Sequence, residues 1–179
     1  GKLLDRRYVD LTDPGLPSHP YHHQGSWAVG RYLDSPWAKP ISLAEAVALI
    51  ERVQASAERR APELLAVLAA AVTVPIVRIA IRACPELPPT VEERIADNRA
   101  QTVADTVMYR QALAEAAEAR GWVVHWYDRA RVFGEAAAAL GVDDVDAFLK
   151  ALGRAAGPPW QAKHKLAAAA ALAAFGERR

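Results

Sequence analysis

The chain has 179 residues, 52% of them hydrophobic and 24% charged, which is typical of a globular protein and excludes a disordered or fibrous one. A formal net charge of +1 excludes a whole-molecule field that would attract nucleic acid or an anionic membrane, so such a partner must be held by a local patch. The single cysteine, Cys84, excludes an intramolecular disulfide and fits a reducing compartment. We expect one domain over residues 1–179.

The apolar runs are too short for a membrane span. The longest uncharged run, Leu64–Val77, contains Pro75 and falls short of the ~20 apolar residues that a spanning helix needs. The first residues, Gly1–Arg7, carry charge without a following apolar segment, so they do not read as a secretory leader. The expected protein is therefore soluble and cytoplasmic, with no membrane partner.

Two short strands are predicted near the N-terminus. Residues 7–11 and 27–33 are rich in Tyr, Val, Trp and Leu, which favour strands. The segment between them holds three prolines and Gly15 and is predicted to be a loop, as is the proline-containing stretch 34–40.

A helix is predicted to begin at a capping box, Ser42–Glu45, because Leu43, Val47, Ile50 and Val53 follow at helical spacing. Pro62 fits the first turn of a second helix, expected over about residues 63–72.

The second half of the chain alternates between helices and strands. A strand is predicted over residues 76–81, and a second capping box at Thr90–Glu93 begins a long helix that ends at Gly121, with a break near residues 98–102. A strand at 122–127 and helices at about 130–140, 145–155 and 161–175 follow. Because helical crossovers separate the strands, part of the sheet should be parallel, and the fold class should be α/β.

This order of elements resembles the RNase H-like superfamily, and within it the RuvC-type Holliday-junction resolvases. In that group the first strand ends in Asp-Pro-Gly-Leu and the second begins Gly-x-x-Ala-Val, and this chain has Asp13–Leu16 and Gly25–Val29. The group's central strand carries Ala-Ile-Glu where this chain has Ala80–Arg82, and its last helix carries Asp-Ala-Ala-Asp-Ala-Leu-Ala where this chain has Ala167–Ala173. The resemblance implies an RNase H-like mixed sheet flanked by helices, with helical additions near the C-terminus.

The resemblance also implies a phosphodiester hydrolase that uses two Mg²⁺ ions, which need several convergent carboxylates. Residue by residue, only Asp13 carries over, because Arg82 stands at the glutamate position and alanines stand at both helix aspartates. A guanidinium would repel a divalent cation, so the match predicts no standard two-metal site.

A variant site remains open if the strand ends and the last helix converge. It would combine Asp13 and Asp10, which would hold Mg²⁺ or Mn²⁺, with Glu86 and with His164 as a ligand or general base. The alternative is structural. An aspartate before Pro-Gly initiates a turn, and Glu86 is then a solvated loop acid.

A nucleic-acid surface is predicted from four basic or aromatic residues. Lys163 and Lys165 at the start of the last helix would contact phosphates together with Arg82, and Trp160 would stack on a base. The alternative is that Trp160 packs onto the core and the lysines are solvated. A buried Arg82 would have to pair with one of the acids.

The histidines of the N-terminal loop, His19, His22 and His23, suit a transition metal, but their spacing is not that of a structural zinc site. The sequence favours a polar loop for them.

Three functions stay open. The leading one is a nucleic-acid-processing RNase H-like protein, a divergent metal-dependent nuclease if it is an enzyme. The alternative is a catalytically inactive protein of the same fold that forms a homodimer or binds a protein partner through its alanine-rich helices. The third is a hydrolase of small phosphorylated compounds.

Overall fold

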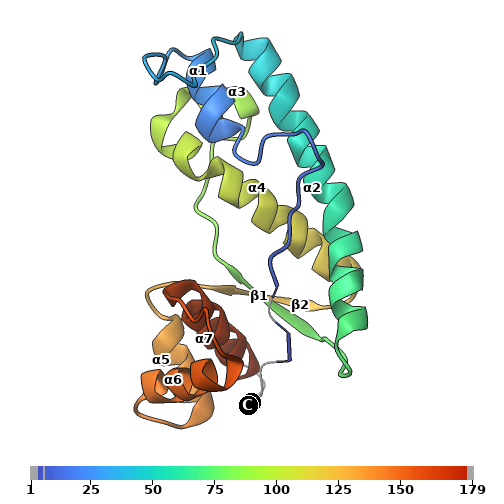
Figure 1. Cartoon of the computed structure of the whole chain (residues 1–179), viewed down its shortest axis with the longest axis vertical. Coiled ribbons are helices and arrows are strands. Elements are labelled where there is room, and N and C mark those ends of the chain that lie inside the picture. The colour runs from blue at the N-terminus through green and yellow to red at the C-terminus, as the bar shows by residue number, and fades with distance from the viewer. Residues whose placement is uncertain (1–3, 6, 177–179) are drawn as a thin grey trace. The chain divides into compact units, whose positions relative to one another are not determined.

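The protein, seen here as a computed structural model, is described for residues 4, 5 and 7–176 (Figure 1). The chain forms two compact units, which we describe separately. Unit 1 comprises Gly1–Tyr8, Val67–Ala83 and Ala117–Arg179, and unit 2 comprises Val9–Ala66 and Cys84–Ala116. Because each unit is assembled from separate stretches, the chain is not a tandem of two sequential domains.

Unit 1 contains a parallel pair of strands, β1 (Arg78–Arg82) and β2 (Val123–Tyr127). Arg78 lies opposite Val123, and Arg82 lies opposite Tyr127. Both strands were predicted within two residues of these bounds, and the predicted parallel pairing is confirmed. The helices α5 (Val132–Leu140), α6 (Val145–Ala156) and α7 (Ala162–Gly176) complete this unit, and all three were also predicted.

The core of unit 1 is built largely from small side chains. Its buried members are Tyr127, Val132, Ala136, Val145, Leu149, Ala169, Ala170 and Ala173. Helices α5 and α7 approach so closely that a Cβ at Gly176 would lie 2.7 Å from the Ala139 Cβ. The buried alanines of α7 therefore pack inside their own unit.

Unit 2 contains the π-helical turn η1 (Tyr21–Gly25), the short helix α1 (Ser26–Ala28), α3 (Val91–Ala96), and most of α2 (Leu43–Ala71) and α4 (Asn98–Ala119). Its core includes Tyr21, Ala46, Ile50, Val53, Ile95, Ala104 and Met108. The segment before η1 runs along α2 and α4, because Asp13 N donates to Ser56 Oγ and the Thr12 hydroxyl meets that of Tyr109 (Figure 1).

The helix starts follow the predicted capping boxes. Thr90 Oγ1 accepts from Glu93 N at 3.2 Å, and the Glu93 carboxylate accepts from Thr90 N at 3.1 Å. Ser42 and Glu45 exchange the same pair of bonds at the start of α2. The predicted break in the long helix lies at Asp97, whose backbone is extended and whose carboxylate caps the first turn of α4.

Four predictions about local structure are wrong. The segment between residues 11 and 27 is not a loop throughout, because η1 and the start of α1 occupy residues 21–26. Residues 7–11 form no strand, and residues 27–33 form the end of α1 and a series of turns. Tyr, Val and Trp favour strands only where a neighbouring strand supplies partners, and among the described residues the sheet contains only β1 and β2. Pro62 opens no new helix. It lies inside α2 with its ring exposed, where it removes one backbone hydrogen bond without ending the helix.

The architecture is helix-rich with a small parallel sheet, which is compatible with the predicted α/β class. Among the described residues, no helix has both the length and the apolar character that a membrane crossing requires.

Candidate functional site

The N-terminal segment of unit 2 forms two tight turns. Asp10 Oδ1 accepts a hydrogen bond from Thr12 N at 2.9 Å, and Leu16 N donates to the Asp13 carbonyl at 3.1 Å. Gly15 has a φ of +88°, which the third position of a type II turn requires. Both aspartates therefore have the turn-forming role that the sequence left open for them.

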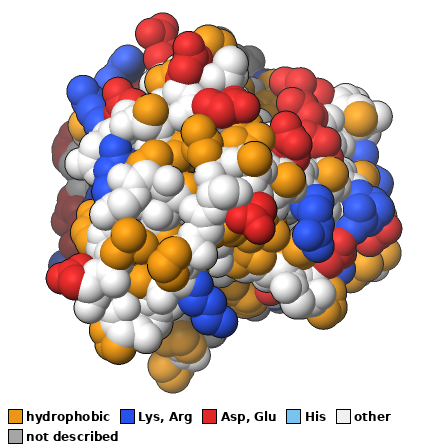
Figure 2. Space-filling model, turned by 90° about the horizontal axis from the view of Figure 1, so that it is seen from above, with side chains coloured by type: hydrophobic (Ala, Val, Ile, Leu, Met, Phe, Trp, Pro, Cys, Tyr) orange, Lys and Arg blue, Asp and Glu red, His pale blue; other side chains and the backbone are white. Residues whose placement is uncertain are grey.

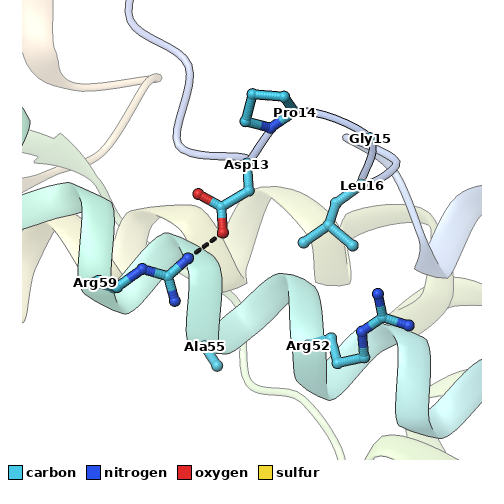
Figure 3. Close-up of a pocket in the computed structure, with 7 residues that line it drawn as sticks. All are labelled: Asp13, Pro14, Gly15, Leu16, Arg52, Ala55 and Arg59. Atoms are coloured by element: carbon cyan, nitrogen blue, oxygen red, sulfur yellow. Dashed lines mark hydrogen bonds and ion pairs between the residues drawn. The ribbon is translucent and has the colours of Figure 1, made fainter.

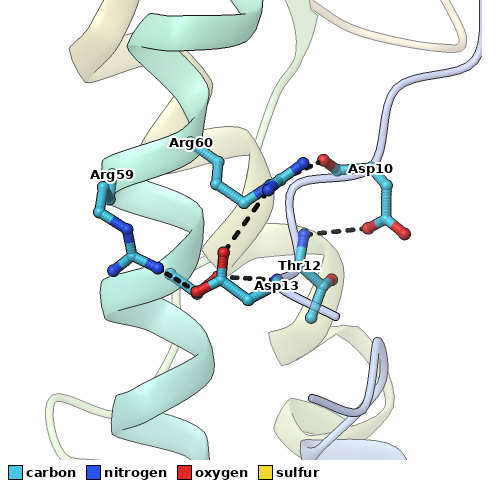
Figure 4. A network of polar contacts seen from close by, with 6 residues as sticks. Asp10, Thr12, Asp13, Arg59 and Arg60 are labelled. Carbon is cyan, nitrogen blue, oxygen red and sulfur yellow. Dashed lines mark hydrogen bonds and ion pairs between the residues drawn. The ribbon is translucent and has the colours of Figure 1, made fainter. Parts of the chain in front are cut away.

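Asp13 is also the centre of an ion-pair network with α2 (Figure 4). Its Oδ2 pairs with Arg59 Nη2, and its Oδ1 lies 3.5 Å from Arg60 Nη1. Its backbone N–H donates to Ser56 Oγ at 2.9 Å, and Arg60 Nε donates to the Asp10 carbonyl at 3.3 Å. The turn is thus fixed to α2 by both its main chain and its carboxylate.

The arginines determine the charge state of Asp13. Desolvation acts to raise the pKa of its carboxyl, but hydrogen bonds from Ser56 and Arg59, together with the charges of Arg59 and Arg60, outweigh it and lower the pKa below its usual value. The carboxylate is therefore ionised at neutral pH. A metal ion at Asp13 would have to displace two guanidinium groups.

An open depression of about 490 Å³ lies beside this turn (Figure 3). It is lined by Asp13, Pro14, Gly15, Leu16, Arg52, Ala55 and Arg59, and we call it the arginine depression. Arg52 and Arg59 project from the same face of α2, two turns apart. Among the described residues, the Arg52 side chain forms no hydrogen bond or ion pair. With Arg60, which pairs with Asp13 from beside the depression, the surface carries three guanidinium groups and one carboxylate and is cationic.

The predicted metal ligands do not form a cluster in unit 2. Glu86 lines a different depression, of about 540 Å³, together with Asp97 and Arg99. Within the described part of the chain, no group of three or more His, Cys, Asp or Glu side chains is placed to hold a metal ion. An aspartate paired with two arginines does not fit the oxygen-rich set of ligands that Mg²⁺ prefers. The binding of Mg²⁺ or Mn²⁺ by Asp10 and Asp13 therefore stays a prediction that this geometry does not favour.

The other predicted residues lie in unit 1. Arg82 is exposed at the end of β1 and, among the described residues, forms no ion pair, as expected for a solvated strand end. His164 Nδ1 accepts from Gln161 N at 3.0 Å, and its ring stacks on that of Trp160. The two rings pack together at the start of α7. A role for His164 as a metal ligand or general base stays a prediction.

Trp160 and the two lysines have different surroundings. The Trp160 ring lies so close to α6 that a Cβ on Gly153 would be 2.4 Å from it, which is the packing alternative considered for this residue. Lys165 Nζ lies 3.1 Å from Asp146 Oδ1. Lys163 is exposed and, of the two lysines, is the better placed to meet a phosphate.

Comparison with known proteins identifies no relative of this chain. No protein-family model matches the chain, and neither a curated protein nor a solved structure is similar to it. The site must be interpreted from its own geometry.

A buried carboxylate that sequence reasoning missed supports the N-terminal segment. Asp105 of α4 is only 4% exposed, and its two oxygens accept from the main-chain N–H groups of Tyr21 and His22, each at 3.0 Å. Burial raises the pKa of Asp105, against the two backbone hydrogen bonds and the charges of His19 and His22. Asp105 thus caps η1 from another helix.

An aromatic cluster follows this cap. The His23 ring stacks on Trp27 at 5.9 Å between centroids with 11° between planes, and Trp37 meets His23 edge-on at 5.8 Å. Burial, with the neighbouring imidazoles of His22 and His19, lowers the pKa of His23, so this ring is neutral at pH 7. The histidines that suggested a metal are used here in ring contacts.

One signal in the sequence does mark this region. An aspartate at position 105 lies between Ala104 and Val107, within the apolar stripe of a helix, where a charged residue needs a partner. Its partners are backbone groups more than eighty residues away, which no local pattern identifies.

Proposed function

We propose that this chain binds the phosphodiester backbone of nucleic acid at the arginine depression, as a divergent RNase H-like protein of nucleic-acid processing. The observation that carries this proposal is the pair Arg52 and Arg59 on one face of α2, beside the Asp13 turn. Guanidinium groups are the preferred side chains for phosphate because they donate in a fixed, forked geometry.

The spacing of these arginines favours a polymer over a small ligand. Seven residues of helix rise about 10 Å, which equals about three nucleotides of one strand at ~3.4 Å each. A strand can therefore place separate phosphates at Arg52 and Arg59, whereas a small monophosphate would reach only one of them. This argues against the third function, a hydrolase of small phosphorylated compounds.

A local surface is also what the charge distribution requires. The net charge is +1, and Figure 2 shows acidic and basic side chains in separate small groups among hydrophobic ones on the face it displays. Long-range attraction of a polyanion is then weak. Binding must come from few contacts and should be sensitive to salt.

Cleavage is the second candidate. It is favoured by one observation, that Asp10 and Asp13 lie in consecutive turns of the same segment. Against it stands the pairing of Asp13 with Arg59 and Arg60. The inactive interaction protein loses part of its support, because the buried alanines of α7 pack inside unit 1.

The test is a titration of labelled single-stranded, duplex and branched DNA and of RNA, followed by fluorescence anisotropy over a range of salt concentrations. Arg52→Ala and Arg59→Ala should each weaken binding and reduce the slope of log K against log[salt] by about one. Arg129→Ala, an exposed arginine in unit 1, is the matched control. No binding by the wild-type protein, or equal effects of all three variants, would refute the proposal.

Incubation with Mg²⁺ or Mn²⁺ separates binding from cleavage. If the wild-type protein cuts none of these substrates under conditions where it binds them, the nuclease candidate is excluded and the binding proposal stands. If it cuts them and Asp13→Asn does not, the carboxylate acts in catalysis.

A further inference from the structure

The loop between α1 and α2 exposes an unusual concentration of large apolar side chains. Residues 29–37 include Val29, Tyr32, Leu33 and Trp37, which are 39%, 50%, 44% and 56% exposed. Isolated exposed apolar residues are common, but four within nine residues are a local concentration of the kind found at interaction sites.

This group of side chains has a rigid aromatic base. Trp27 is only 9% exposed, and it contacts both the stacked His23 ring and Trp37, the latter at 6.1 Å between centroids. Trp37 also meets His23 edge-on and follows Pro36 in the chain. The contacts with His23 and Trp27 therefore fix the Trp37 indole, while more than half of its surface is exposed to solvent.

The second exposed ring, that of Tyr32, belongs to a residue with a strained backbone. Tyr32 has a φ of +56°, the one positive value among the described non-glycine residues. A left-handed conformation is unfavourable for a residue with a Cβ, and such strain persists where surrounding structure imposes it. Here Ser35 N donates to the Tyr32 carbonyl at 3.1 Å and closes the turn.

The chemistry around the rings favours an anionic ligand. The segment 19–40 carries two permanent cations, Arg31 and Lys39, against one acid, Asp34. Arg31 itself is structural, since it donates to the Ile95 and Ala96 carbonyls at the end of α3. Lys39 is exposed two residues from Trp37 and is free of any hydrogen bond or ion pair to the described residues. A flat open ring beside a lysine suits a base attached to a phosphate.

We propose that Trp37, supported by His23 and Trp27 and accompanied by Tyr32, is a stacking platform for unpaired bases, so that the nucleic acid bound by unit 2 is single-stranded. This inference rests on the proposed function for the attraction of the backbone, but it adds a separate site with a different chemistry. In a duplex the base faces are covered by their neighbours, whereas in a single strand each face can meet an indole.

The experiment compares two labelled oligonucleotides of equal length, one with normal bases and one abasic, with the wild-type protein and Trp37→Ala. Stacking on one aromatic ring accounts for about a 5- to 150-fold change in affinity when that ring is replaced by alanine. We expect Trp37→Ala to lose about 10-fold in affinity for the normal strand and almost nothing for the abasic strand. Trp126→Ala, at an exposed tryptophan of β2, is the matched control and should bind as the wild type does.

The outcomes are distinct for the two proposals. If Trp37→Ala binds the normal strand as the wild type does while Arg59→Ala does not, the platform is wrong and the phosphate surface stands. An equal loss on both strands would also overturn base stacking, because the abasic strand has nothing to stack. If the wild-type protein binds neither strand, the proposed function fails and this inference fails with it. Trp37→Phe keeps a flat ring and should restore most of the affinity, which excludes a folding defect as the cause.

Discussion

Replacing Asp105 by Asn tests how the N-terminal segment is held on α4. The aspartate places one oxygen on each of two main-chain N–H groups, those of Tyr21 and His22, at 3.0 Å. Asparagine has nearly the same shape but only one acceptor oxygen. Its amide group must face the other N–H, so a buried donor loses its partner.

The magnitude follows from these two bonds. A buried donor without a partner costs about 1–3 kcal/mol, and the remaining bond loses its charge assistance, worth about 1 kcal/mol. Asparagine carries no charge, so the variant avoids the cost of desolvating a buried carboxylate, and this offsets part of the loss. The same desolvation raises the pKa of Asp105 in the wild type. We expect Asp105→Asn to lower the free energy of unfolding by about 2 kcal/mol.

The same replacement should change the pH dependence. Because burial raises the pKa of Asp105 in the folded state, the stability linked to this group is complete below its unfolded pKa of ~3.9 and is lost as pH rises through the folded value. The advantage of the wild type over Asp105→Asn should therefore shrink as pH rises above about 4.

Urea unfolding followed by circular dichroism measures the global effect, and amide hydrogen exchange at Tyr21 and His22 measures the local one. Asp143→Asn, an exposed aspartate that precedes α6, is the control and should change stability by less than about 0.5 kcal/mol. If Asp105→Asn matches this control and the exchange of both amides is unchanged, the capping role is refuted.

Two further predictions concern the ion pair and the small core. Asp13→Asn frees the guanidinium of Arg59, so affinity for a single-stranded oligonucleotide at low salt should rise about two- to five-fold; a fall in affinity would contradict the arginine depression. Gly153→Ala places a Cβ 2.4 Å from the Trp160 ring and should lower stability in urea by about 1–3 kcal/mol. Gly134→Ala, where no atom lies within 4 Å of the new Cβ, should raise stability by up to ~1 kcal/mol, and similar effects at both glycines would contradict this packing.

Sequence reasoning succeeded where local rules decide the structure. Thr90 and Glu93 specify a helix start by exchanging bonds with each other's backbone, and Gly141 ends α5 in the left-handed conformation that glycine favours. The strands at β1 and β2 are short apolar runs bounded by turns and were found for the same reason. These signals need no distant partner.

It failed where a distant residue determines the local structure. Residues 21–28 are helical because Asp105 supplies the acceptors for the first N–H groups, and no neighbour in the chain reports this. Asp13 was selected for its motif, but its partners Arg59 and Arg60 are nearly fifty residues away. The sequence showed three histidines but not the aromatic cluster, because the contacts of His23 with Trp27 and Trp37 exist only in the folded chain.

The division of the chain into interleaved stretches affects how the protein can be made and dissected. Val67–Ala83 interrupts the sequence of unit 2, so no continuous fragment contains that unit alone, and isolating it requires a linker that joins residue 66 to residue 84. During translation unit 2 is complete once residue 116 has left the ribosome, whereas unit 1 must wait for α7. The ribosome-bound chain therefore passes through a stage in which the nucleic-acid surfaces proposed above can be folded while β1 is still without β2.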